Sequence, residues 1–163
     1  MFFASSSARA THGFNSGKIA FSVKWAGNME VKLDEVKEPH EIRVGFSTND
    51  CNLQAGESPL SFCCINTGKK ASNSEFEDFE CKFTNDDVIT ALLDMQGNQV
   101  QISYMKNGDT LGEFCQRWVE YEYTKEIKFR AIQYTRKFYF GYSIHHKICF
   151  KLFFKNFNQF FFR

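Results

Sequence analysis

Residues 85–95, Asn-Asp-Asp-Val-Ile-Thr-Ala-Leu-Leu-Asp-Met, decide the fold of this chain. Their centre, residues 88–93, is apolar except for Thr90 and is too short for a long helix. An apolar run of this length is typical of a strand that is buried on both faces. We therefore expect this strand at the centre of a sheet.

The segment that follows alternates between apolar and polar residues. Val100, Ile102 and Tyr104 fall on one face of a strand, and Gln101 and Ser103 fall on the other. The pairs Gly97-Asn98 and Asn107-Gly108 flank this segment, and both supply the positive φ angles of tight hairpin turns. The pattern predicts an antiparallel β-meander.

These motifs resemble the SPRY domain and, more narrowly, the SPRY domain of the heterogeneous nuclear ribonucleoprotein U group. The resemblance follows the family's order over about residues 6–114. The motifs that carry it are Arg9-Ala10-Thr11-x-Gly13-x-x-x-Gly17-Lys18, His-Glu-Ile-Arg-Val-Gly-Phe-Ser at 40–47, Gly56-Glu57, Thr67-Gly68-Lys69-Lys70, Phe76-Glu77-Asp78-Phe79, Asp87-Val88-Ile89 and Val100-x-Ile102-Ser103-Tyr104-x-Lys106-Asn107-Gly108-x-x-Leu111-Gly112.

The resemblance implies an all-β fold, an antiparallel β-sandwich of the concanavalin-like jelly-roll kind. It implies a non-catalytic module that binds a protein or peptide through loops at one edge, in a ribonucleoprotein context and in the nucleus. In the family, residues 76–79 form a tight loop that is usually followed by glycine, whereas this chain has Glu80 there. A glycine also commonly follows Val-Ile, where this chain has Thr90.

Two further alternating runs predict strands before the meander, at 17–25 and 40–47. In the second run, Ile42, Val44 and Phe46 share a face, and we expect His40 and Arg43 to make local hydrogen bonds at a strand edge.

Two polar connections, 48–60 and 66–74, are the predicted recognition loops, because long loops on a rigid scaffold commonly carry binding. Together with the turn at Asn107 they supply the candidate protein-binding residues, which are Asp50, Cys51, Asn66, Lys69, Lys70 and Asn107. Gly68-Lys69 is not a phosphate loop, because Cys63 replaces the first glycine and Lys70 replaces the hydroxyl residue of that motif.

The six cysteines, at 51, 63, 64, 81, 115 and 149, show no Cys-x-x-Cys spacing. We expect free thiols in a reducing compartment, no structural metal and no cofactor. Acidic pairs such as Asp86-Asp87 lie at turn spacings, and His12 and His40 have structural contexts. No catalytic residues are predicted, so the sequence does not indicate an enzyme.

The chain changes character at about residue 115. Residues 1–115 hold 10 basic and 16 acidic residues, net −6, whereas residues 116–163 hold 10 basic and 3 acidic residues, net +7. Ten of the 20 Phe residues follow residue 128. We expect a SPRY domain at 6–115, truncated before its last strands, and a non-homologous Phe/Lys-rich tail at 116–163.

The tail has three interpretations. Its residues are those of A/T-rich codons, which favours translation through non-coding sequence and a truncated, non-functional product. Lys and Arg interleaved with Phe and Tyr would also suit RNA binding, so RNA is a possible partner, bound indirectly or through the tail. The third interpretation is contact with a membrane surface, but Lys151, Lys155, Asn156 and Asn158 exclude a spanning helix.

The N-terminal residues do not indicate secretion. The apolar run Met1-Phe2-Phe3 is far too short for a secretory signal, and a transit peptide is disfavoured because residues 1–16 contain a single Arg. We expect a nuclear protein by resemblance, otherwise a cytoplasmic one.

Overall fold

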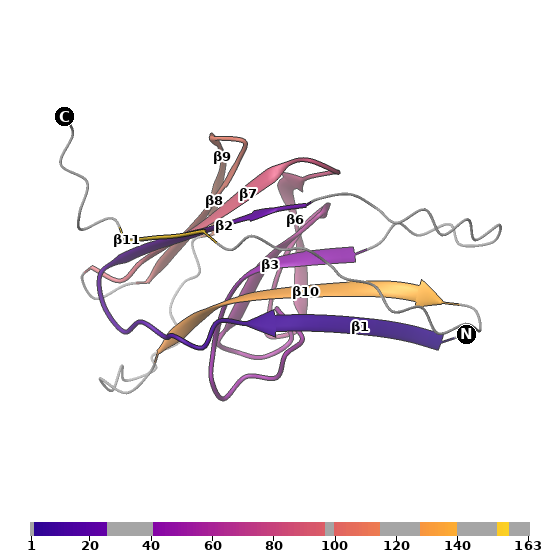
Figure 1. Cartoon of the computed structure of the whole chain (residues 1–163), viewed down its shortest axis with the longest axis horizontal. Coiled ribbons are helices and arrows are strands. Elements are labelled where there is room, and N and C mark those ends of the chain that lie inside the picture. The colour runs from indigo at the N-terminus through magenta and orange to yellow at the C-terminus, as the bar shows by residue number, and fades with distance from the viewer. Residues whose placement is uncertain (1, 26–40, 97–99, 115–127, 140–152, 157–163) are drawn as a thin grey trace.

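The computed structural model is built of strands in two antiparallel sheets (Figure 1). It describes residues 2–25, 41–96, 100–114, 128–139 and 153–156. The strands are β1 (Phe2–Arg9), β2 (Lys18–Lys24), β3 (Glu41–Thr48), β4 (Ser61–Ile65), β5 (Thr67–Ser72), β6 (Glu75–Lys82), β7 (Val88–Asp94), β8 (Gln101–Lys106), β9 (Asp109–Phe114), β10 (Phe129–Tyr139) and β11 (Phe153–Asn156).

The six-stranded sheet has the order β1-β10-β3-β4-β5-β6, and the five-stranded sheet has the order β11-β2-β7-β8-β9. Every pair of neighbouring strands is antiparallel. The predicted antiparallel β-sandwich is confirmed. No helix long and apolar enough to cross a membrane occurs among the described residues.

The main core lies between the two sheets. Alternate residues of β3 and β2 meet there, and the rings of Phe21 and Phe46 pack edge to face with centroids 5.0 Å apart. Phe79 of β6 packs in the same way on the buried Tyr104 of β8, at 6.1 Å. Burial of these aromatic rings adds a large apolar contribution to the contact between the sheets.

The decisive strand β7 is central, because it lies between β2 and β8. Ile89, Ala91 and Leu93 are buried, whereas Thr90 and Leu92 are only half-buried. The prediction of burial on both faces is therefore wrong, since the described chain covers one face of the five-stranded sheet more completely than the other. The predicted turn is confirmed at Asn107 (φ 53°) and Gly108 (φ 97°), while residues 97–99 lie outside the described residues.

Two segments expected as loops are strands. Residues 67–72 form β5 and residues 75–82 form β6, joined by a two-residue turn at Asn73 and Ser74. Both turn residues have positive φ, 52° and 62°, which is the geometry of a type I′ hairpin. The turn was not predicted from the sequence, because it has Asn-Ser in place of the usual Asn-Gly.

The structure also differs from the expectation of missing closing strands. β10 pairs with both β1 and β3, and β11 pairs with β2. Phe129, Ala131 and Ile132 of β10 are buried. Part of the segment 116–163 therefore adds strands to both sheets. The predicted domain end at residue 115 and the three interpretations of this segment stay predictions.

Candidate functional site

The outer face of the six-stranded sheet, which points away from the main core, is covered by the loop at residues 49–60. Ala55 of this loop packs into a second buried cluster with Cys63, Ile65, Ala71 and Ile132. Gly56 has a φ of +87°, and a Cβ there would lie 2.8 Å from both the Ala71 Cβ and the Cys63 Sγ. Glycine is therefore required for the loop to lie flat on the sheet.

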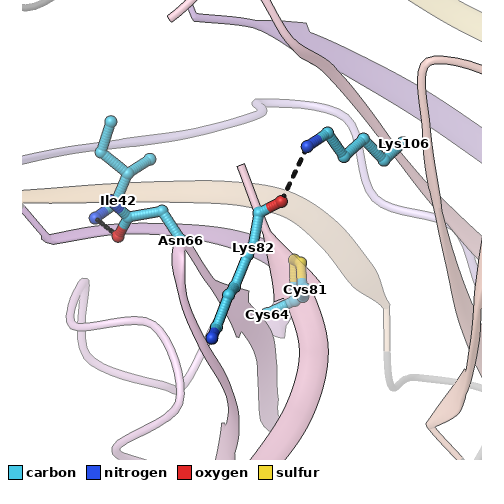
Figure 2. Close-up of a disulfide and its surroundings, with 6 residues drawn as sticks. All are labelled: Ile42, Cys64, Asn66, Cys81, Lys82 and Lys106. Carbon is cyan, nitrogen blue, oxygen red and sulfur yellow. Dashed lines mark hydrogen bonds between the residues drawn. A yellow bond between two sulfur atoms is a disulfide. The ribbon is translucent and has the colours of Figure 1, made fainter. Parts of the chain in front are cut away.

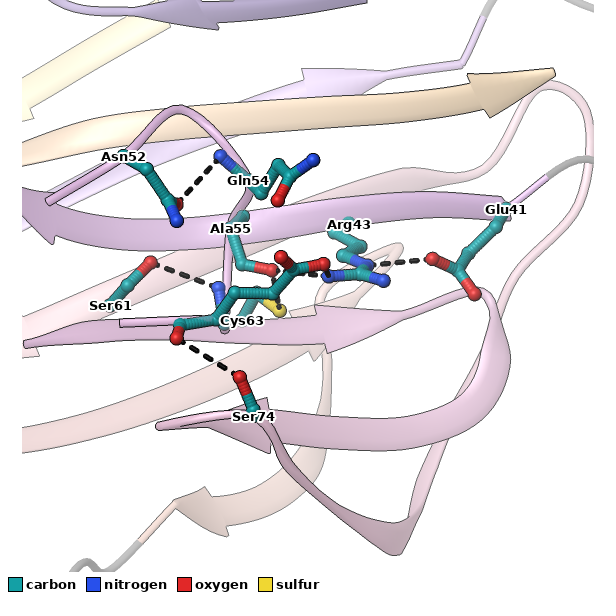
Figure 3. Close-up of polar contacts among 10 residues, drawn as sticks. Glu41, Arg43, Asn52, Gln54, Ala55, Ser61, Cys63 and Ser74 are labelled. Atoms are coloured by element: carbon teal, nitrogen blue, oxygen red, sulfur yellow. Dashed lines mark hydrogen bonds and ion pairs between the residues drawn. The ribbon is translucent and has the colours of Figure 1, made fainter. Parts of the chain in front are cut away.

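Arg43 of β3 binds this loop from the sheet that the loop covers (Figure 3). Its guanidinium donates to the carbonyl oxygen of Ala55 at 2.8 Å and forms ion pairs with Glu41 at 2.6 Å and Glu57 at 3.2 Å. The Arg43 side chain is only 3% exposed. Burial lowers the pKa of Arg43, but the charge of Glu41 and its hydrogen bond raise it by more, so the guanidinium stays charged.

Arg9 of β1 holds the first half of the loop. Its two terminal nitrogens donate to four carbonyl oxygens, those of Thr48 and Asn49 (both 2.9 Å), Cys51 (2.6 Å) and Asn52 (2.7 Å). The carbonyl of Thr48 also accepts the N–H of Cys51 at 3.3 Å. The planar guanidinium thus supplies donors to four carbonyls that a loop would otherwise satisfy partly with water. The two arginines make the loop a fixed surface.

The hairpin between β5 and β6 extends this surface. The N–H of Ser74 donates to the carbonyl of Gly56 at 2.9 Å, and the N–H of Asn73 donates to that of Ser58 at 3.2 Å. Phe76 follows the hairpin and lies 5.3 Å from the Arg43 guanidinium carbon, in a cation–π contact. We call residues 49–60, the hairpin 73–74 and Phe76 the loop surface.

The large apolar side chains that are exposed in the described part of the chain both lie on the loop surface. They are Leu53, 49% exposed, and Phe76, 45% exposed. Asn49, Asp50, Asn52 and Gln54 surround Leu53 with exposed polar side chains. Two apolar anchors within a polar rim are typical of a protein-binding surface.

The structure separates the predicted binding residues. Asp50 and Cys51 lie in the loop surface, where Asp50 is exposed and Cys51 is half-buried, with its Sγ 3.2 Å from the hydroxyl of Thr48. Lys69 and Lys70 lie on β5 and not in a loop. Lys69 is exposed, whereas Lys70 forms an ion pair with Glu77 at 3.0 Å.

Asn66, after β4, lies at the opposite end of the six-stranded sheet from the loop surface, and Asn107 follows β8 of the five-stranded sheet. We call these two turns and the adjoining residues 82–87 the turn end; Figure 2 shows Asn66, Lys82 and Lys106 of this region. The Asn66 side chain accepts the N–H of Ile42 at 2.8 Å, and the Asn107 side chain accepts that of Val88 at 2.8 Å. Both amides therefore stabilise turns.

Asp87 links the parts of the turn end. Its carboxylate accepts the N–H of Thr84 at 2.8 Å and the Asn107 amide at 2.7 Å, and it pairs with Lys106 at 3.1 Å. The hydrogen bond from Thr84, together with Asn107 and Lys106, lowers the pKa of Asp87 from 3.8 to about 2. Lys106 also donates to the carbonyl of Lys82 at 3.0 Å, which joins β8 to the end of β6.

The prediction of free thiols is wrong for one pair of cysteines. Cys64 of β4 and Cys81 of β6 form a disulfide with Cα atoms 6.1 Å apart (Figure 2). The two strands flank β5, and its register shift at Gly68 brings them close. Cys63 points to the opposite face from Cys64 and is free, as is Cys51. Cys115 and Cys149 lie outside the described residues.

The described residues offer no constellation for metal or nucleophile chemistry. They contain no group of three or more His, Cys, Asp or Glu side chains that could hold a metal ion. Burial raises the pKa of Cys63 to about 12, so its thiol stays protonated and unreactive.

The sequence did not indicate Arg9, Arg43, Leu53 and Phe76 as parts of the surface. Arg43 lies in β3, an interior strand of the sheet whose sequence alternates between apolar and other residues. Its side chain is on the face opposite Ile42 and Val44. A charged residue at such a position could have indicated a buried cation. Leu53, an isolated apolar residue in a polar connection, carried a similar signal.

Comparison with known proteins agrees with this architecture. A family model described as "SPRY domain" matches residues 28–157. The chain is 36% identical over 107 residues to "Heterogeneous nuclear ribonucleoprotein U-like protein 2" of Homo sapiens, covering 66% of this chain and 14% of that protein. It is 43% identical over 70 residues to "ATP-dependent RNA helicase Ddx1" of Drosophila melanogaster, covering 43% of this chain and 9% of that protein.

A further relative is "ATP-dependent RNA helicase DDX1" of Xenopus laevis, 33% identical over 104 residues, with 64% of this chain and 12% of that protein covered. The matched region spans about one seventh of the length of the first of these relatives, 14%. Since the family model covers most of the chain and the two-sheet sandwich is the fold that the motifs imply, this chain belongs to the SPRY domain family, a family of protein-interaction domains.

Proposed function

We propose that this protein binds a protein or peptide partner through the loop surface. The observation that carries the proposal is the position of Leu53 and Phe76, the large exposed apolar side chains of the described chain, on one fixed surface. Such side chains dominate binding energy when a polar rim excludes water around them. The arginine clamps fix the loop before binding, which reduces the entropy lost on association.

A peptide selection tests this proposal with peptides of random sequence as the probe. Peptides enriched from a display library on the whole chain are measured again against Leu53→Ser and Asp50→Ala. We expect Leu53→Ser to weaken the enriched peptides by more than about tenfold, the usual effect of losing an apolar anchor. The matched control is Lys69→Ser, an exposed residue of β5 outside the loop surface. Equal affinities for Leu53→Ser and the parent would overturn the proposal.

We further propose a nuclear ribonucleoprotein context. Its support is that the two kinds of relatives are named for a nuclear ribonucleoprotein and for an RNA helicase. In that context the module holds a protein of an RNA-bound assembly and has no catalytic role of its own. A tagged chain should accumulate in the nucleus and co-purify with its partner after ribonuclease treatment, whereas cytoplasmic retention would contradict the proposal.

Direct RNA binding through residues 116–163 is the alternative. Its support is the net charge of +7 in that segment. If these residues contact RNA, the logarithm of affinity should fall by about 0.7 per contacted phosphate for each logarithm of salt concentration. A salt-independent or undetectable RNA affinity would exclude this alternative and leave the protein-binding surface.

A further inference from the structure

The strand β6 forms one edge of the six-stranded sheet, with β5 as its neighbour among the described strands. A two-residue hairpin is closed by a residue pair that exchanges both backbone hydrogen bonds, and here that pair is Ser72 and Glu75. Hydrogen-bonded and non-hydrogen-bonded residue pairs alternate along an antiparallel ladder, so the next hydrogen-bonded pair is Lys70 and Glu77. The N–H and C=O groups of Phe76 and Asp78 therefore point away from the sheet.

These outward backbone groups lie on an accessible part of the edge. Glu75, Phe76, Glu77 and Asp78 are all exposed. The far end of β6 is different, because Lys106 donates to the carbonyl of Lys82 there. The first half of β6 therefore presents an open row of donors and acceptors, which is a template for another strand.

The charge of β6 selects which strand it accepts. Of its eight residues, Glu75, Glu77, Asp78 and Glu80 are acidic, and Lys82 is basic. Glu77 is partly neutralised by its ion pair with Lys70. A second copy of β6 would place carboxylates against carboxylates, so the edge disfavours pairing with itself. An extended segment rich in Lys and Arg would instead find opposite charges on both faces.

A hollow beside the edge supports a basic ligand. It has a volume of about 600 Å³ and is lined by Thr67, Gly68, Asp78, Phe79, Glu80 and Lys82. It lies where the register between β5 and β6 shifts near Gly68, whose φ of +89° permits the irregular backbone. Two of its lining residues, Asp78 and Glu80, are acidic and one, Lys82, is basic, so the acidic charge is in excess and suits the charged end of a long basic side chain.

We propose that β6 binds an extended basic segment of a partner protein, which adds to the six-stranded sheet as a further antiparallel or parallel strand. Backbone hydrogen bonds to Phe76 and Asp78 supply the affinity, and the carboxylates of β6 supply the preference for Lys and Arg. The hollow takes one basic side chain of the segment. The edge shares Phe76 with the loop surface, through the backbone of that residue, but it does not include Leu53 and goes beyond the proposed loop surface.

The probe is a short fluorescent peptide that alternates lysine and valine, measured by anisotropy against the whole chain. A second peptide of the same sequence and charge carries an N-methyl group on every residue, which removes all the N–H groups that an added strand could donate to the sheet edge. We expect this methylated peptide to lose binding. Equal affinities of the methylated and unmethylated peptides would overturn the proposal, because simple charge attraction does not distinguish them.

Protein variants test the position of the strand. Asp78→Lys combined with Glu80→Lys should weaken the lysine–valine peptide by at least about tenfold, through loss of attraction and added repulsion. The matched control is Asp109→Lys combined with Glu113→Lys, the same total charge change on β9, the edge strand of the other sheet. An equal loss with the control, or tight binding of a glutamate–valine peptide, would overturn the proposal.

The two proposals fail separately. Leu53→Ser should leave the lysine–valine peptide unaffected, while the Asp78→Lys and Glu80→Lys double variant should leave peptides selected on the loop surface unaffected. Thermal unfolding of each variant shows whether the sandwich is intact. If the parent chain does not bind the lysine–valine peptide at all, the edge proposal is wrong, whatever the loop surface does.

Discussion

The loop surface and the turn end use polar groups in opposite ways. At the loop surface, Arg9 and Arg43 reach from strands and donate to loop carbonyls. At the turn end, Asn66 and Asn107 bind the backbone with their own side chains. Within the loop, the side chains of Asn52 and Ser58 also accept backbone N–H groups. Asp50 and Leu53 nevertheless keep exposed side chains for a partner, whereas Asn66 and Asn107 use theirs for stability.

This difference explains why polar composition alone does not locate a binding site. A short turn needs its own Asn or Asp to satisfy unpaired backbone groups, so that side chain is already occupied. A longer loop can be held by side chains from the scaffold below it. Among the predicted residues, Asp50 therefore stays a candidate for partner binding, while Asn66 and Asn107 have structural roles in this arrangement.

Removing the central clamp of the loop should have the largest effect. Arg43→Leu leaves Glu41 and Glu57 without their cation and leaves the Ala55 carbonyl with only the weak thiol donor of Cys63, at 3.4 Å. We expect a loss of about 3–5 kcal/mol in the free energy of unfolding, the usual result of breaking a buried ion pair from one side. Urea denaturation measures it, with Lys69→Leu on the same face of the sheet as the control. A loss no larger than that of the control would show that the loop does not depend on Arg43.

A disulfide joins β4 to β6 next to the turn end, so reduction should destabilise the six-stranded sheet there. Opening the Cys64–Cys81 disulfide frees a loop with a sequence separation of 17, and chain entropy predicts a loss of about 3 kcal/mol. Urea denaturation with and without a thiol reductant measures this loss. The variant Cys81→Ser should be insensitive to the reductant. Alkylation of both residues in the unreduced chain would contradict the disulfide.

Arg9→Ala tests the outer half of the loop clamp. It removes hydrogen bonds to four carbonyls, but the loop end it holds is partly open to water, which can replace the donors. We expect a loss of about 2 kcal/mol, and faster proteolysis within residues 49–53. Lys18→Ala, which removes an exposed cation paired with Asp94 at 2.8 Å, is the control. Unchanged proteolysis would mean that the loop is held by Arg43 alone.

Much of the sandwich could be predicted because alternation and turn residues are local signals. Ile42, Val44 and Phe46 lie in the main core as expected, and the Asn107-Gly108 hairpin has the predicted geometry. β5 and β6 could not be recognised, because Lys and Glu dominate them and the sheet edge tolerates such residues. The strand role of Phe129 and its neighbours was hidden, because long-range pairing with β3 leaves little trace in a Phe- and Lys-rich segment.

The candidate site was less predictable than the fold. The position of the loop could be predicted from its length and polarity, and Asp50 lies on the loop surface. The Arg9 contacts join residues about 40 positions apart, such as Arg9 and Asn49. The Arg43 contacts to Ala55 and Glu57 span 12 and 14 positions, and no local pattern encodes either set. The exposed state of Leu53 depends on how Gly56 sets the loop on the sheet, which is likewise a property of the folded chain.

The smallest effect concerns Asp87 at the turn end, and it depends on pH. The pKa of Asp87 is about 2 in the folded chain against an ordinary value of 3.8, so the folded state prefers the charged carboxylate. This contribution is complete above about pH 4 and is lost as the pH falls through 2. Asp87→Asn should therefore be less stable than the parent at neutral pH, by about 1 kcal/mol for a surface network of this kind.

The difference between Asp87→Asn and the parent should shrink between pH 4 and pH 2, because the parent carboxylate becomes protonated over that range. The neighbouring Asp86→Asn is the control, since Asp86 is 81% exposed and its carboxylate pairs only with Lys24, at 3.3 Å, among the described residues. Chemical denaturation at a series of pH values compares the three chains. If the Asp87→Asn difference persisted unchanged at pH 2, the lost interaction would depend on shape and not on charge. The turn end would then be held by the Asn107 amide and not by the carboxylate network.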